Sequence, residues 1–187
     1  SVTIIEKNEF PKHKVCGEYI SNEVLSYCEF LEINFEELYV NHIDQLEFSL
    51  PNGTSFSAKL PLGGFGVSRY TLDFYLFEKA KEQGCIFIED EVKEVTFLED
   101  AFSTYTNNYH HITSKIVLGA FGKRSNLDIA MHREFIQKKS YWLAIKAHYL
   151  GDFPNKLVGL HNFEGGYCGV SKVENNLINI CYLAQYD

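Results

Sequence analysis

The sequence predicts a mixed α/β (α+β) fold, in which a parallel β-α-β region is followed by an antiparallel sheet. The clearest helix, residues 71–83, is followed directly by the apolar stretch CIFIED, and this order of elements favours a parallel sheet. From Tyr141 onward the chain consists of strand-like alternating runs, which are typical of an antiparallel sheet with one face in water. Charged residues become more frequent at 133–139, so we expect domains over residues 1–135 and 136–187.

Local patterns predict the elements that precede the long helix. Residues 2–6 are apolar on both faces and predict a short buried strand that ends in an acid. Ser21 is placed to cap a helix with an apolar face. The stretch LEFSLPNGTSFSAKL alternates around Asn52-Gly53, which predicts a hairpin near residues 44–60.

A helix, a meander and a further strand are expected in the middle of the chain. Helix 71–83 carries an apolar stripe, and Gly84 is placed to follow its last turn. Residues 91–114 alternate and predict a three-stranded meander. The apolar stretch KIVLGA, residues 115–120, predicts a return to a buried strand. The last region then offers four strand-like runs: YWLAIKAHYL, KLVGLHNF, GYCGVSKVE and NLINICYL.

Composition and charge limit the partners of this chain. The 187 residues carry a formal net charge of −8, which disfavours nucleic acid as a partner, because phosphates are bound by clustered Lys and Arg. No apolar run is long enough to span a bilayer, whereas peripheral contact with a membrane stays open. His161 and Glu164 would point to opposite faces of a strand, so no metal site is expected.

The cysteines and the two ends of the sequence give further expectations. Five cysteines lie far apart without a C-x-x-C pair, which argues against a disulfide framework or a zinc site and fits a reduced, cytoplasmic protein. The sequence opens with SVTIIEKNEF, already strand-like and without Met, and it closes with the strand-like NICYLAQYD. We therefore expect an internal fragment of a longer protein.

Four stretches in a fixed order carry the functional information: VTIIEK, KVCGEYIS, GVSRYTLDFYLFEKA and KIVLGAFGKRS. This arrangement resembles the FAD-dependent oxidoreductases of the geranylgeranyl reductase and flavin-dependent halogenase group, relatives of the para-hydroxybenzoate hydroxylase class. The resemblance implies that residues 1–135 are a partial FAD/NAD(P)-binding Rossmann-like domain with a β-meander. Residues 136–187 would then be part of an antiparallel-sheet substrate domain, with the hairpin near 44–60 on the substrate side.

The resemblance also implies a set of residues that contact FAD. In a dinucleotide-binding fold an acid at the end of the second strand accepts hydrogen bonds from the adenosine ribose, and Glu6 follows such a strand. Arg69 stands at the mouth of a helix, where its guanidinium suits phosphate oxygens. The backbone near Val92 is expected to meet the adenine edge. The complete set is Glu6, Lys7, Lys14, Cys16, Gly17, Arg69, Val92 and Gly122.

The sequence departs from the family pattern at Phe121. GAFGKRS matches the pattern Gly-Ala-Asp-Gly-x-x-Ser except that Phe121 replaces the acid, which leaves NAD(P)H as a reductant in question. Lys123 and Arg124 are expected in a solvated turn. The glycine fingerprint of the first strand and the later Gly-Asp motif are absent, so the chain alone is expected to bind FAD weakly or not at all. The W-x-W-x-I-P segment of halogenases is absent too, which favours reduction or hydroxylation over halogenation.

The sequence thus predicts part of a flavin-dependent oxidoreductase, a reductase or monooxygenase that acts on a hydrophobic small molecule such as an isoprenoid, aromatic or polyene metabolite. No catalytic residue is predicted. One alternative is a non-catalytic module that binds a lipid-like or aromatic ligand on a degenerate flavoprotein fold. Another is an NAD-using dehydrogenase, although the KVCGE loop has no role there.

The loop HKVCGEYIS predicts different outcomes for two neighbouring substitutions. By resemblance the loop passes beside the flavin ring, so its shape matters more than the sulfur of Cys16, although a nucleophilic Cys16 activated by Lys14 stays an alternative. In the full-length protein, Cys16→Ala should keep much of the flavin binding, whereas Gly17→Val should lose it. Titration with FAD measures both, and equal tolerance of the two changes would contradict this interpretation.

Overall fold

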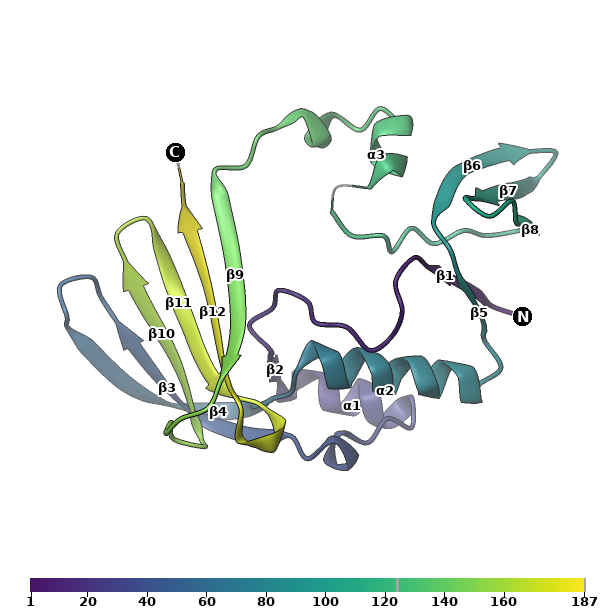
Figure 1. The fold of residues 1–187 in the computed structure, drawn as a ribbon. Coiled ribbons are helices and arrows are strands. Elements are labelled where there is room, and N and C mark those ends of the chain that lie inside the picture. Colours follow the sequence, from purple (N-terminus) through teal and green to yellow (C-terminus); the bar gives the residue numbers. More distant parts are fainter. Residues whose placement is uncertain (124, 187) are drawn as a thin grey trace. The chain divides into compact units, whose positions relative to one another are not determined.

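The computed structural model describes residues 1–123 and 125–186, and its contacts divide the chain into two compact units. The first unit contains residues 1–9 and 77–140, and the second contains residues 10–76 and those from 141 onward. Figure 1 shows the elements of both units. Arg124, expected in a solvated turn, lies outside the described residues. In the described residues no helix is both long and apolar enough to cross a bilayer.

A parallel strand pair forms the base of the first unit. β1 (Thr3–Glu6) pairs in parallel with β5 (Ile86–Glu89), in register from Thr3 opposite Ile86 to Glu6 opposite Glu89. Helix α2 (Arg69–Glu82) precedes β5, and in its last part Phe77 packs edge-on against Phe87, with ring centroids 4.4 Å apart. Gly84 follows with φ +80°, a conformation that favours glycine. The predicted parallel β-α-β order is confirmed.

The expected meander follows. β6 (Val92–Leu98), β7 (Ala101–Thr106) and β8 (His111–Ser114) form an antiparallel three-stranded sheet. Glu99 and Asp100 both have positive φ, as a tight turn between twisted strands requires. The buried side chain of Asp90 holds the entry to the meander, because it accepts hydrogen bonds from the N–H groups of Glu91 and Asn108.

One predicted element of the first unit is wrong. Residues 115–120 form no strand, and Ile116 and Leu118 are largely exposed. A strand needs a neighbour for its N–H and C=O groups, and in the described residues the sheet of β1 and β5 contains only those two strands. Apolar composition alone therefore predicted a strand that the structure leaves unpaired. Sequence patterns also missed α3 (Asn126–Ala130), capped by Ser125, and the 3₁₀ turn η3 (Glu134–Gln137).

The second unit is built on a seven-stranded sheet with the order β2-β4-β3-β10-β11-β12-β9. All neighbouring strands are antiparallel except β3 and β10, which are parallel. The strands are β2 (Tyr19–Ser21), β3 (Asn41–Ser49), β4 (Ser55–Gly66), β9 (Trp142–Tyr149), β10 (Leu157–Phe163), β11 (Gly166–Lys172) and β12 (Ile178–Gln185). The predicted hairpin around Asn52-Gly53 is β3–β4, and it lies in one sheet with the strands that follow residue 141 (Figure 1).

Short helices complete the second unit. Ser21 accepts a hydrogen bond from the N–H of Glu23 at the start of the 3₁₀ turn η1 (Asn22–Val24), which continues into α1 (Leu25–Phe30). Two further 3₁₀ turns are η2 (Phe35–Leu38) and η4 (Glu174–Asn176). The core between these helices and the sheet consists of Cys28, Phe35, Val40, Phe65 and Val67. The sequence thus predicted the first helix at the right place, although it is shorter than a regular helix.

The packing of β4 makes one glycine irreplaceable. A Cβ added at Gly66 would overlap the backbone oxygen of Lys172, and backbone cannot move aside as a flexible side chain can. Gly66→Ala is therefore expected to lower the free energy of unfolding by about 2–3 kcal/mol, measured by urea denaturation. Gly151→Ala is the matched control, because its Cβ would meet only Ile178 Cδ1 at an ordinary 3.5 Å. Equal stability of the two variants would contradict the predicted overlap.

Candidate functional site

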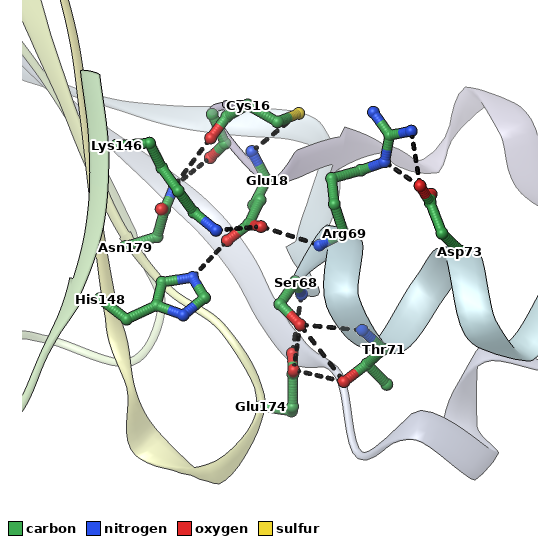
Figure 2. Close-up of polar contacts among 11 residues, drawn as sticks. Cys16, Glu18, Ser68, Arg69, Thr71, Asp73, Lys146, His148, Glu174 and Asn179 are labelled. Carbon is green, nitrogen blue, oxygen red and sulfur yellow. Dashed lines mark hydrogen bonds and ion pairs between the residues drawn. The ribbon is translucent and has the colours of Figure 1, made fainter. Parts of the chain in front are cut away.

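The loop of residues 13–18 has a fixed backbone and an open side. Asn179 on β12 donates from its Nδ2 to the carbonyl oxygens of Gly17 (2.8 Å) and Cys16 (3.3 Å). The Sγ of Cys16 accepts from the N–H of Glu18 at 3.4 Å. A Cβ at Gly17 would meet no described atom within 4 Å. Asn179 of the sheet therefore supports the loop (Figure 2), while the space beside the Cα of Gly17 is open.

Two of the predicted cofactor residues meet at one carboxylate. Arg69, the first residue of α2, donates from Nε and Nη2 to the two oxygens of Asp73 at 2.7 and 2.9 Å. Lys14 Nζ lies 2.7 Å from Asp73 Oδ2. Burial opposes ionisation of Asp73, but the hydrogen bonds from Arg69 and Lys14 outweigh it and hold the pKa of Asp73 below its ordinary value. Two cations on one anion leave the cluster with net positive charge, which suits an anionic group.

Arg69 also links this cluster to the loop. The hydrogen bond to Asp73 raises the pKa of Arg69 above its ordinary value, and the side chain of Cys16 makes a weaker contribution in the same direction. Lys14, Cys16 and Arg69, which the sequence predicted as cofactor-binding, are therefore brought together in the second unit. Cys16 is a free thiol, and no group of metal-ligating side chains is found among the described residues.

Two buried carboxylates from distant parts of the chain accept hydrogen bonds from backbone N–H groups at the N-terminus of α2. Glu174, which follows β11, accepts the N–H of Ser68 at 2.8 Å and the hydroxyl of Thr71 at 2.7 Å. Glu18 accepts the N–H of Arg69 at 2.8 Å. Negative charge at this end of a helix is favourable, because the first N–H groups have no partner within the helix. These two N–H groups are thus occupied by protein acids.

Glu18 lies at the centre of an ion cluster (Figure 2). Its side chain has no exposed area, and its oxygens lie 2.7 Å from Lys146 Nζ and 2.6 Å from His148 Nε2. Both partners are on β9, two residues apart, so they project from the same face of the sheet. His13 extends the cluster, because its ring lies edge-on to His148 and stacks on Tyr70.

Sequence reasoning missed most of this cluster. Glu18 follows the motif that was singled out, but its partners lie about 130 positions later. One signal was present: the Lys-Ala-His of YWLAIKAHYL places two basic side chains on one face of an otherwise apolar strand. The missed residues are Glu18, Ser68, Asp73, Lys146, His148, Glu174 and Asn179.

The remaining predicted residues lie in the first unit. Glu6 ends β1, and its Oε1 accepts from the backbone and side-chain nitrogens of Asn8 at 3.0 and 2.6 Å. Lys7 Nζ pairs with Glu91 Oε1 at 2.9 Å, and this hydrogen bond raises the pKa of Lys7. Val92 begins β6 beside Glu91. Glu6 therefore stands at the carboxyl end of a parallel strand, as the ribose-binding interpretation requires.

The glycine loop of the first unit accommodates the unusual Phe121. A Cβ at Gly119 would lie 2.9 Å from a ring carbon of Phe121, so the ring packs directly over this glycine. Gly122 has φ +72° and open space around its Cα. The aromatic ring thus lies close to the position that a side chain at residue 119 would take.

Comparison with known proteins identifies the fold. No family profile and no curated protein sequence matches the chain. Among solved structures it is similar to the flavin-dependent brominase Bmp2, with a TM-score of 0.76, 17% identity, 99% of this chain covered and 50% of that chain. Halogenase PltM in complex with phloroglucinol and FAD gives a TM-score of 0.75 at 13% identity, covering 98% of this chain and 47% of PltM.

A third structure is a flavoprotein/dehydrogenase from Cytophaga hutchinsonii, with a TM-score of 0.75, 16% identity, and 98% and 49% of the two chains covered. The fold is that of flavin-dependent enzymes. The chain spans about half the length of these structures. The predicted mixed α/β fold is confirmed, while likeness to geranylgeranyl reductases in particular stays a prediction.

Glu174 makes the site sensitive to acid. Burial opposes its ionisation, but hydrogen bonds from Ser68 and Thr71 hold its pKa below the ordinary value. The stability it contributes is therefore complete above the ordinary glutamate pKa of about 4.3 and is lost as the pH falls through the lower value of the folded state. Glu174→Gln should lower the free energy of unfolding by about 2 kcal/mol at pH 7 and less near pH 3, measured by urea denaturation. The exposed Glu164→Gln is the control, and a loss that does not shrink at low pH would contradict this account.

Proposed function

We propose that the protein containing this chain is an FAD-dependent oxidoreductase, a reductase or monooxygenase, that acts on a hydrophobic small molecule. The observation that carries the proposal is the loop of residues 14–17. It is open at Gly17, positively charged at Lys14 beside Arg69, and held from behind by a buried ion cluster, on a fold shared with flavin-dependent enzymes.

The side chains of the chain suit the parts of FAD. Glu6 ends a parallel strand, and its carboxylate is the acceptor that a ribose diol requires. Lys14 and Arg69 offer positive charge to a phosphate or to an anionic flavin, and their shared Asp73 fixes their position. Gly17 lacks a side chain where the backbone would approach a flat ring. The bound flavin would supply hydride or oxygen transfer, and these residues would bind and orient it.

The side chains on one face of the sheet in the second unit favour the proposal that the substrate is apolar. Strand register places Trp142, Leu183, Tyr167 and Leu160 on the same face as Lys146. Tyr149 and Phe163 lie on the opposite face, so only some of the sheet aromatics can serve one ligand. Trp142 and Tyr167 are both about half exposed, as expected for side chains that receive a ligand. We assign no catalytic acid or base.

Phe121 bears on the electron donor and on the alternative function. A phenyl ring accepts none of the hydrogen bonds that the family's acid would accept, which weakens the case for direct handling of NAD(P)H. The same replacement is the observation that favours the second candidate, a non-catalytic module for a lipid-like or aromatic ligand. The odd number of free thiols supports a reducing compartment, so we place the protein in the cytoplasm.

Flavin loading of the full-length protein tests the proposal. The purified protein should be yellow, or take up one FAD on titration followed by flavin fluorescence. Lys14→Met should raise the FAD dissociation constant about tenfold, because it removes one charge-assisted contact. Lys59→Met, at an exposed lysine of β4, is the control and should leave the constant unchanged. A colourless full-length protein that binds no added FAD would reject the oxidoreductase and favour the binding module.

A further inference from the structure

The buried charge of Glu18 requires an explanation. A carboxylate removed from water costs several kcal/mol unless it is paired and hydrogen-bonded. The side chain of Glu18 is fully buried, and the side chain of Lys146 is nearly so, with 5% of it exposed. An apolar residue would fill this place more simply if stability alone mattered. A buried charge differs from an apolar residue in that its contacts have fixed directions.

Directional contacts are what the charge supplies. The two carboxylate oxygens reach the N–H of Arg69, the ammonium of Lys146 and the imidazole of His148. The backbone oxygen of Glu18 also accepts the N–H of Val67 at 3.2 Å. Glu18 thereby fixes the end of the loop to both the helix start and strand β9.

The peptide next to Glu18 is fixed from the other side. Asn179 donates to the carbonyls of Cys16 and Gly17, and register places Asn179 directly opposite His148 in the sheet. The other carboxamide atom of Asn179, Oδ1, is buried and has no hydrogen-bond partner among the described residues. The Cys16–Gly17 peptide is thus flanked by polar contacts on both sides, while a Cβ on Gly17 would meet no described atom within 4 Å.

We propose that Glu18 is a positioning residue and forms, with Lys146 and His148, an ionic lock that holds the Cys16–Gly17 peptide in the shape that the flavin contacts. The inference rests on the proposed FAD-dependent function. Glu18 does not touch the flavin in this account. It acts through the loop, and Lys146 and His148 act through Glu18.

Glu18→Gln in the full-length protein tests the lock with two readouts. The FAD dissociation constant should rise at least tenfold, and the amides of residues 16–18 should exchange with deuterium at least tenfold faster in the flavin-free protein. The exposed Glu164→Gln should change neither. Unchanged exchange would overturn the lock, and faster exchange with unchanged affinity would overturn its role toward the flavin. Faster exchange in a protein that never binds FAD would leave the lock standing and reject the proposed function instead.

A pair of variants guards against simple unfolding. Lys146→Met leaves the buried carboxylate of Glu18 with one cation fewer. The folding equilibrium constant of the double variant Glu18→Gln/Lys146→Met should therefore be at least tenfold larger than that of Lys146→Met alone. Urea denaturation measures both, and purely additive losses would overturn the lock.

Discussion

The N-terminus of α2 is the constraint on which the second unit depends. The N–H groups at this end have no partner within the helix, and two buried acids satisfy those of Ser68 and Arg69. Each acid comes from a distant segment, and a buried acid needs partners of its own. Lys146 and His148 on β9 meet that need for Glu18, and Ser68 and Thr71 meet it for Glu174. Helix, loop and sheet therefore form their polar contacts together.

This arrangement decides how the second unit can receive an anion. A helix N-terminus often binds phosphate through its free N–H groups, but here the protein's own carboxylates occupy those of Ser68 and Arg69. Positive charge must instead come from side chains, and Lys14 and Arg69 provide it around Asp73. Side-chain cations with a shared acid are held in place before a ligand arrives, which lowers the entropy that binding would cost.

The sequence predicted what local patterns encode. The helix that ends before Gly84, the turn at Asn52-Gly53 and the meander all depend on periodicity and turn residues within short windows. Residues 115–120 are apolar like a buried strand, but in the described part of the chain no strand pairs with them, so apolar composition was not sufficient to form a strand there. The ion cluster could not be predicted from local patterns, because Glu18 and His148 are 130 positions apart in the sequence and meet only in the folded chain. At the candidate site, the structure brings together Lys14, Cys16 and Arg69, which the sequence singled out, whereas sequence patterns did not indicate Asp73 and Glu18, the acids that contact Arg69.

The backbone at Glu18 shows which force dominates in the loop. Its φ of +54° lies in the left-handed region, which costs a residue with a side chain roughly 1–2 kcal/mol and favours Gly, Asn or Asp. Glycine at this position would avoid that cost, but it would leave Lys146 and His148 without the carboxylate between them. Hydrogen bonds to charged groups contribute about 1.5–3 kcal/mol each, and Glu18 makes several of them. The polar contacts of Glu18 therefore outweigh its backbone conformational preference. This strained residue directly follows Gly17, and the open side of Gly17 is where the loop can meet a ligand.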